Sequence, residues 1–173
     1  MTHHNPRGPM EVHPIGVIHS TWTEAKGTPI QPRFADGGQA EASVELHPRY
    51  VEGLADLDGF DRIWLVYWFD RAPSAKLTVT PFMDDQPRGL FSTRAPCRPN
   101  PIGVSPVKLL AVEGNRLRIA ECDILDGTPL LDIKPYAPRY DVFADASGGW
   151  LDRGDPTRTR ADQRFAGDGD GPE

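Results

Sequence analysis

Apolar and polar residues alternate along much of this chain with the period of two that is typical of β-strands. Residues 42–46 alternate in this way, and residues 15–18 form a short β-branched run. Residues 62–69 are almost entirely apolar, as expected for a strand that is buried on both faces. Residues 76–80 and 130–134 continue the pattern. We therefore predict a mainly β protein.

A β-hairpin is predicted in the second half of the chain. The apolar segments 107–112 and 117–121 flank the polar residues 113–116. Gly114 and Asn115 supply the positive φ angles that a tight turn between two strands requires. The two segments are therefore expected to pair directly.

One short helix is predicted after residue 47. Pro48 is tolerated in a first helical turn, and the apolar residues that follow share one helical face. These residues are Tyr50, Val51, Leu54 and Leu57. Six or more short strands with long loops and one short helix indicate a β-barrel or a sandwich, and no Rossmann-type domain is expected.

Residues 94–105, RAPCRPNPIGVS, form a stiff and basic segment that we call the proline motif. Its three prolines lack backbone donors, which argues against a helix and against the interior of a sheet. A segment that is already rigid loses little entropy when it binds a ligand. We predict that it forms a wall of a binding site. A connection stiffened only for stability is the alternative.

The composition divides the chain into three parts. We expect residues 1–11 to form a flexible N-terminus without a secretory signal and residues 12–150 to form one folded domain. Residues 151–173 are polar with little to bury, and we expect them to be disordered or loosely docked. No apolar run approaches the roughly 20 residues of a membrane helix. Because two cysteines are too few for a disulfide framework or a zinc site, we expect reduced thiols and a cytoplasmic protein.

The charge of the chain is unevenly distributed. The formal net charge is −6, yet residues 88–118 carry six basic residues and one acidic residue. Residues 36–62 carry seven acidic residues and two basic ones. A charge-segregated surface can bind a polyanion locally while the whole protein stays acidic. Two ordinary solvated faces are the alternative.

Several common catalytic motifs are missing. The sequence has no GxxxxGK[ST] loop, no GxGxxG after a strand, no GxSxG and no HExxH, and we expect no metal site. The remaining candidates are polar residues in loops at strand ends, where binding residues often lie. They are residues 31–34, 70–71, 94–105 and 126–128.

Several of these residues also belong to a set of ordered motifs. The motifs are PIGVI at 14–18, FSTR at 91–94, RPNPIGVS at 98–105, DGTP at 126–129 and DIKPY at 132–136. The set resembles the TrmO family, also called TsaA-like or YaeB-like, over roughly residues 14–141. This resemblance implies a β-barrel methyltransferase that uses S-adenosylmethionine and forms a homodimer, with the cofactor near the subunit interface. In characterised members the substrate is tRNA, and the methyl group goes to N6 of the threonylcarbamoyl-adenosine beside the anticodon.

The resemblance also implies which residues contact the cofactor. They are Pro32, Arg33, Phe34, Asp70, Arg71, Arg94, Val104, Leu125, Asp126, Gly127 and Thr128. S-adenosylmethionine has no phosphate, so the missing phosphate-binding loop is no objection. N6 must lose a proton during the transfer, and Asp126 or Asp70 is a candidate to accept it.

Two departures from the family keep other functions open. Many tRNA-active members carry a His-Gln pair where this chain has Asp70-Arg71, and longer members continue into a small C-terminal domain where this chain has a polar tail. The leading hypothesis is a tRNA methyltransferase. The alternatives are a methyltransferase for a small molecule and a non-enzymatic barrel that binds S-adenosylmethionine as a sensor.

Overall fold

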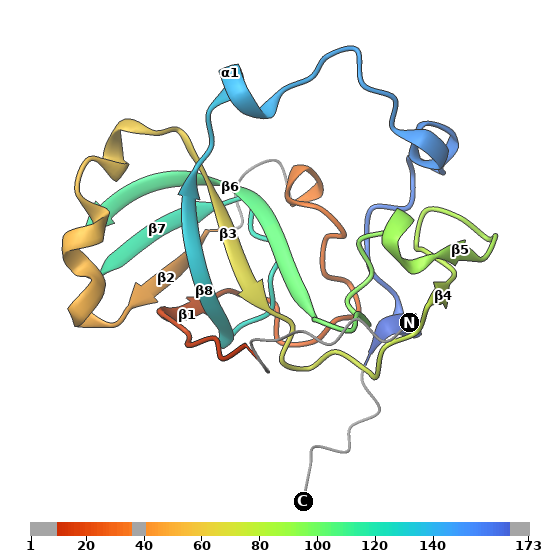
Figure 1. Ribbon diagram of the computed structural model, residues 1–173, viewed down its shortest axis with the longest axis horizontal. Coiled ribbons are helices and arrows are strands. Elements are labelled where there is room, and N and C mark those ends of the chain that lie inside the picture. The colour runs from red at the N-terminus through yellow and green to blue at the C-terminus, as the bar shows by residue number, and fades with distance from the viewer. Residues whose placement is uncertain (1–9, 36–40, 167–173) are drawn as a thin grey trace, which may run out of the picture.

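The computed structural model describes residues 10–35 and 41–166. Six strands close into a barrel in the order β1, β2, β7, β6, β3, β8, and every neighbouring pair is antiparallel (Figure 1). The strands are β1 (Gly16–His19), β2 (Ala42–Leu46), β3 (Arg62–Trp68), β6 (Ile102–Glu113), β7 (Arg116–Ala120) and β8 (Thr128–Pro135). The predicted mainly β fold is confirmed, and it is a barrel rather than a sandwich.

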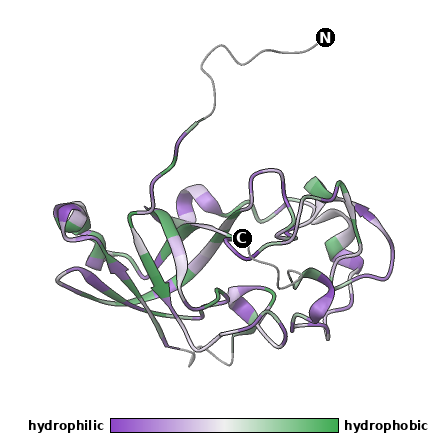
Figure 2. Cartoon of the chain, turned by 90° about the horizontal axis from the view of Figure 1, so that it is seen from below, coloured by the Kyte–Doolittle hydropathy of each residue, from purple (hydrophilic) through white to green (hydrophobic). Residues whose placement is uncertain are grey.

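Alternate residues of each strand point into the barrel and form one apolar core. The inward residues include Ile18, Val44, Leu46, Ile63, Leu65, Val107, Leu117, Ile119 and Leu130. Hydrophilic and hydrophobic positions follow one another along the barrel strands in Figure 2. The period of two in the sequence therefore becomes the inside and the outside of a closed sheet.

Strand β6 starts earlier than predicted, inside the proline motif. Residues 102–108 pair with β3, and residues 108–113 pair with β7. Pro101 precedes the first paired residue, and Pro106 lies in the half of β6 that pairs with β3 alone. Alternate backbone groups of that half face no second strand, so proline is tolerated there. The prediction that the proline motif stays out of the sheet is wrong for residues 102–105.

The predicted helix is present as the 3₁₀ helix η3 (Pro48–Leu54), followed by η4 (Leu57–Gly59). A seven-residue segment is too short to stabilise an α-helix by itself, and 3₁₀ turns serve as short connectors. The other short helices are η1 (Pro32–Phe34), η5 (Leu90–Ser92), α1 (Pro138–Asp141), η6 (Gly149–Arg153) and η7 (Gln163–Phe165). Within the described ranges, no helix has the length and the apolar character needed to cross a membrane.

A loop-rich side lies next to the barrel (Figure 1). The predicted strand at 76–80 is shortened to β4 (Thr78–Val79), which pairs with β5 (Arg88–Gly89). A small apolar cluster supports this pair, formed by Val79, Leu90, Ala95 and Cys97 with Phe165 packed against it.

Residues 149–166 run along this loop-rich side, and we call them the C-terminal strap. Arg160 forms a β-bridge with Pro29, and the Ala161 N–H donates to the Thr28 carbonyl at 2.8 Å. Phe165 meets Phe82 edge to face at 5.0 Å. The tail is therefore docked as far as residue 166, through backbone pairing with residues 28–30 and through the packing of Phe165. Residues 1–9 and 167–173 of the predicted flexible ends lie outside the described residues.

Candidate functional site

The connections at one end of the barrel carry almost all of the predicted site residues. Strands β1, β3 and β7 end at this edge, whereas β2, β6 and β8 begin there. The β1–β2 connection carries Pro32, Arg33 and Phe34; the β3–β6 connection carries Asp70, Arg71 and Arg94; the β7–β8 loop carries Leu125, Asp126 and Gly127; and Thr128 begins β8. Val104 lies on β6, two residues into the strand. We call this end of the barrel the site end.

The β7–β8 loop is fixed by the residues that follow β1. The Ser20 N–H donates to Asp126 Oδ1 at 3.1 Å, and the Asp126 N–H donates to the Trp22 carbonyl at 2.7 Å. The Gly127 N–H donates to the Ile18 carbonyl at 2.9 Å. Gly127 has a φ of +78°, which only glycine adopts readily. The glycine of the DGTP motif therefore allows the turn that presents Asp126.

Arg71 joins the β3–β6 connection to the same loop. Its Nη2 donates to the Asp126 carbonyl at 2.6 Å and to Thr128 Oγ1 at 3.5 Å. Its Nε lies 3.6 Å from the Asp70 carboxylate. The pair that departs from the family pattern thus forms part of the site framework.

A second group of predicted residues lies around Arg94. Its Nη1 donates to Gln31 Oε1, in the residue just before η1. Helix η1 lies against β6; its Pro32 is buried and its Arg33 is exposed. Within the described ranges, no hydrogen bond or ion pair joins Arg94 to Arg71 or Asp126. The structure therefore gathers the predicted residues into two groups at one end.

The proline motif is held by its own backbone and by the barrel. Arg98 Nη1 donates to the Thr93 carbonyl at 3.0 Å, so this arginine braces the loop. A Cβ added to Gly103 would lie 2.3 Å from the Tyr67 ring. Only glycine lets β6 cross that ring, which explains the glycine of RPNPIG. Val104 points outward and is 49% exposed.

A polar chain at the site end was missed by the sequence analysis. Ser105 Oγ donates to Asp123 Oδ1 at 2.7 Å, and the Tyr67 hydroxyl lies 3.1 Å from Ser105 Oγ. Burial raises the pKa of Asp123 to about 7. The sequence carried a signal, because Asp123 stands between the apolar residues Cys122 and Ile124.

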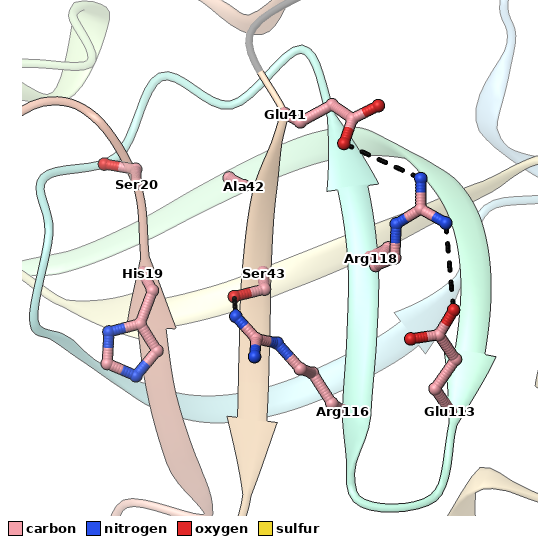
Figure 3. A pocket seen from close by; sticks show the side chains of 8 residues that line it. All are labelled: His19, Ser20, Glu41, Ala42, Ser43, Glu113, Arg116 and Arg118. Carbon is pink, nitrogen blue, oxygen red and sulfur yellow. Dashed lines mark hydrogen bonds and ion pairs between the residues drawn. The ribbon is translucent and has the colours of Figure 1, made fainter.

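A shallow pocket of about 400 Å³ adjoins the site end (Figure 3). It is lined by His19, Ser20, Glu41, Ala42, Ser43, Glu113, Arg116 and Arg118, none of which was a predicted cofactor residue. His19 Nδ1 lies 3.5 Å from Asp126 Oδ1, so the pocket borders the β7–β8 loop. Arg116 donates to Ser43 Oγ at 2.9 Å. The pocket is a neighbour of the predicted site rather than the site itself.

The fold interleaves the acidic segment 36–62 and the basic segment 88–118. Strand β2 of the acidic segment pairs with β7 of the basic segment, which sets Glu45 opposite Arg116. Arg118 lies 3.6 Å from Glu41 and 3.7 Å from Glu113. The resulting surface is mixed, so these strands offer no continuous basic face.

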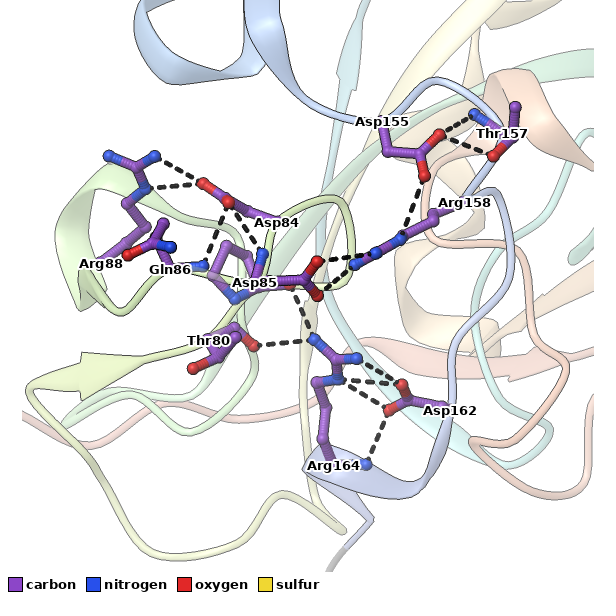
Figure 4. A network of polar contacts seen from close by, with 11 residues as sticks. Thr80, Asp84, Asp85, Gln86, Arg88, Asp155, Thr157, Arg158, Asp162 and Arg164 are labelled. Carbon is purple, nitrogen blue, oxygen red and sulfur yellow. Dashed lines mark hydrogen bonds and ion pairs between the residues drawn. The ribbon is translucent and has the colours of Figure 1, made fainter.

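Arginines of the C-terminal strap are also paired (Figure 4). Arg158 makes two hydrogen bonds to the Asp85 carboxylate, at 2.7 and 2.9 Å. Arg164 Nη2 lies 2.7 Å from Asp162. These side chains hold the strap in place rather than projecting from it toward a phosphate backbone.

Comparison with known proteins identifies the family. The tRNA-methyltransferase O N-terminal domain family matches residues 17–142. The chain belongs to the TrmO family. The family assignment predicted from the motifs is therefore confirmed. A probable S-adenosyl-L-methionine-binding protein of Pyrococcus abyssi is 51% identical over 140 residues, which cover 81% of this chain and 75% of the relative.

More distant TrmO relatives and a solved structure agree with this assignment. The human tRNA (adenine(37)-N6)-methyltransferase is 34% identical over 141 residues, 78% of this chain and 32% of that protein. The crystal structure of TrmO from Pseudomonas aeruginosa matches with a TM-score of 0.68 and 40% identity, covering 82% of this chain. This chain spans 62% of that structure's chain.

The groups at the site end suit the S-adenosylmethionine expected in this family. The Asp70 and Asp126 carboxylates suit an ammonium or sulfonium cation, and the Arg94 guanidinium suits a carboxylate. Phe34 and Trp22 offer aromatic faces near the same loops. Within residues 10–35 and 41–166, no cluster of three or more acidic, histidine or cysteine side chains could hold a metal ion.

Proposed function

We propose that this protein is an S-adenosylmethionine-dependent methyltransferase that methylates N6 of threonylcarbamoyl-adenosine beside the anticodon of tRNA. The observation that carries the proposal is the meeting of the predicted cofactor residues in three connections at one end of a TrmO-family barrel. Relatives named as S-adenosylmethionine-binding proteins and as a tRNA methyltransferase support it.

When bound, S-adenosylmethionine supplies an activated methyl group on a sulfonium. The task of the protein is then to hold donor and acceptor in line, which can account for much of the rate enhancement. The proline motif and the anchored β7–β8 loop suit this task because both are fixed before the ligand arrives. Arg71 couples the loop to β3, so the two walls keep a constant spacing.

A small-molecule acceptor is the second candidate. The net charge is −6, and the arginines of β7 lie beside Glu45 of β2 and Glu113 of β6. Both features weaken the electrostatic attraction that dominates binding to nucleic acid. Binding to tRNA would then depend on cations at the rim of the site, such as the exposed Arg33 and Arg94.

We also propose a homodimer that works in the cytoplasm. Trp68, Ile102 and Val104 are 37%, 39% and 49% exposed on the outer face of β3 and β6. Trp68 pairs with Ile102 beside the site end, so these residues form an apolar patch next to Val104. Such a patch is typical of an interaction surface. Light scattering of the purified protein tests this part, and a monomer at micromolar concentration contradicts it.

The deciding experiment is mass spectrometry of nucleosides after the purified protein is incubated with S-adenosylmethionine and threonylcarbamoyl-modified tRNA. One added methyl on the modified adenosine supports the proposal. Cofactor binding without methylation of tRNA favours a small-molecule acceptor. Cofactor binding without a methylated product from any nucleoside or metabolite pool favours a sensor. Calorimetry of Arg94→Ala and Asp126→Ala tests the site, since each is expected to weaken cofactor binding in a folded barrel.

A further inference from the structure

Asp123 lies in the β7–β8 loop, three residues before Asp126, and its partly buried side chain points toward Ser105 of β6. Its carboxylate accepts a hydrogen bond from Ser105 Oγ at 2.7 Å. Ser105 is 1% exposed and in turn lies 3.1 Å from the hydroxyl of the buried Tyr67. This chain of three groups links β3, β6 and the loop that carries the DGTP motif.

Among the titratable groups of this cluster, only the Asp123 carboxyl is expected to gain or lose a proton near neutral pH. Burial raises the pKa of Asp123 to about 7, against the lowering influence of the Ser105 hydrogen bond and the Arg94 charge. Burial also raises the pKa of Tyr67 well above its ordinary value and that of Cys122 to about 12, so both stay neutral. A carboxyl that binds and releases a proton near the working pH is well suited to acid–base chemistry.

The other two carboxyls of the site end are held differently. Asp126 accepts the Ser20 N–H at 3.1 Å and lies 3.5 Å from His19, and Asp70 lies 3.6 Å from Arg71. Both carboxyls are also partly exposed, and these contacts tie them to the framework of the site. These contacts suit Asp126 and Asp70 to binding rather than to proton transfer.

Asp123 is linked to both groups of predicted residues, the one around Arg94 and the one around Asp126. Arg94 is close enough for its charge to act on the Asp123 carboxyl, and Asp126 belongs to the same loop. Ser105 directly follows Val104, the predicted residue on β6. The carboxyl therefore adjoins both β6, through Ser105, and the loop that carries the DGTP motif.

We infer that Asp123 is the proton acceptor of the methyl transfer, with Ser105 as the residue that positions its carboxylate. The inference rests on the proposed function. The acceptor nitrogen forms a bond to the methyl carbon as the carbon–sulfur bond of the donor breaks. The electron pair of the N–H bond stays on nitrogen, and its proton moves to the Asp123 carboxylate. The proton then leaves to solvent, so the charges balance.

Single-turnover methylation of threonylcarbamoyl-modified tRNA, measured between pH 5.5 and 9, tests the inference. The wild-type rate is expected to rise with pH to a plateau above about pH 7. Asp123→Asn is expected to lose about 100-fold or more in rate and to lose the pH dependence. Asp58→Asn is the matched control, because Asp58 is exposed in η4 near the opposite end of the barrel. This variant is expected to keep the wild-type rate and its pH dependence.

Ser105→Ala keeps the inference testable where Asp123→Asn fails to fold. Loss of the hydrogen bond that lowers the pKa of Asp123 is expected to shift the rise in rate to higher pH. Carbon-13 NMR titration of the aspartate carboxyls gives a readout apart from activity. A resonance that titrates near pH 7, and is absent from Asp123→Asn, is expected in the protein without tRNA.

The outcomes separate this inference from the proposed function. A wild-type enzyme that methylates tRNA, with Asp123→Asn equal to it in rate and pH profile, overturns the role of Asp123 alone. A carboxyl that titrates near pH 4, or a Ser105→Ala profile that does not move, also overturns it. A wild-type protein that binds S-adenosylmethionine and leaves the modified tRNA unmethylated overturns the proposed function, and the inference with it.

Discussion

The barrel and the loop-rich side are held together by different forces. The barrel closes around a continuous apolar core, and residues such as Ile63, Leu65 and Leu117 are fully buried in it. The loop-rich side has a small cluster around Leu90 and Cys97, and much of its cohesion is polar. Arg158 with Asp85 and Arg88 with Asp84 illustrate this polar network (Figure 4).

This difference assigns distinct tasks to the two regions. Burial of apolar area contributes about 25 cal/mol per Å², so the barrel supplies most of the folding free energy. Exposed ion pairs contribute little each and weaken with salt. The barrel therefore fixes where the three connections begin and end. The strap and the loops contribute less to the folding free energy, and we expect substitutions in them to destabilise the protein less than substitutions in the barrel core.

The largest effect is expected from Leu65→Ala in β3. Leu65 is 0% exposed, and a cavity of this kind destabilises a protein by about 2–5 kcal/mol. Urea unfolding followed by circular dichroism measures the change. Leu77→Ala on the loop-rich side is the matched control, since Leu77 is 69% exposed and a loss within about 0.5 kcal/mol is expected. Equal losses in the two variants contradict the comparison.

A smaller loss of about 1–3 kcal/mol is expected from Gly103→Ala. The added Cβ would lie 2.3 Å from the Tyr67 ring, so β6 must shift at the point where it carries the proline motif. Thermal unfolding and cofactor calorimetry are both expected to respond. Gly89→Ala in β5 is the control, because no atom lies within 4 Å of its added Cβ. Identical melting temperatures of the two variants would show that β6 can accept a Cβ at residue 103 beside the Tyr67 ring.

The two regions are expected to respond to pH in opposite directions. On the loop-rich side, hydrogen bonds from Arg88 and Arg158 lower the pKa of Asp84 and Asp85. Their stabilisation is present above the ordinary aspartate pKa and is lost as the pH falls through the lowered values. Limited proteolysis of the strap is expected to accelerate at acid pH before the barrel unfolds.

The barrel shows the reverse trend because of Asp123. Its pKa is raised to about 7, so the folded state binds the extra proton and stability declines as the pH rises from about 4 to about 7. The slope is at most about 1.4 kcal/mol per pH unit. Asp123→Asn is expected to abolish the decline in unfolding experiments. A wild-type barrel equally stable at pH 5 and pH 8 contradicts this assignment.

The smallest effect is expected from Arg158→Ala in the strap. Loss of its two hydrogen bonds to Asp85 loosens the strap but leaves the barrel core untouched. Hydrogen exchange of the Ala161 amide, which donates to Thr28, is expected to speed up several-fold without a change in the melting temperature of the barrel. The exposed Arg153→Ala is the control. Unchanged exchange in Arg158→Ala shows that the backbone pairing holds the strap alone.

The strands were predictable because a closed barrel imposes a strict inside and outside on each of them. Alternation located β2 within its observed bounds, and the Gly114-Asn115 turn located the β6–β7 hairpin. The start of β6 was missed because the rule against proline applies to a strand that is paired on both sides. Residues 102–107 are paired with β3 alone, and the order of strands that makes this possible is not visible in local sequence.

The site was predictable only in part. The resemblance named residues in separate loops, but their meeting at one end follows from antiparallel strand directions that no single motif encodes. Asp123 stands between the apolar residues Cys122 and Ile124, but it lies outside the DGTP motif, so the motifs did not point to it. The composition of the strap left both disorder and loose docking open. Its order comes from backbone pairing with residues 27–30, which composition does not reveal.

The bridge between Pro29 and Arg160 has a consequence for biosynthesis. The last barrel strand, β8, ends at residue 135, so the barrel can close on the ribosome while the strap is still inside the exit tunnel. The loop before η1 gains its β-bridge only when residues 159–161 emerge. The newly made chain can therefore close its barrel before the loop that precedes η1 gains its bridge to the strap.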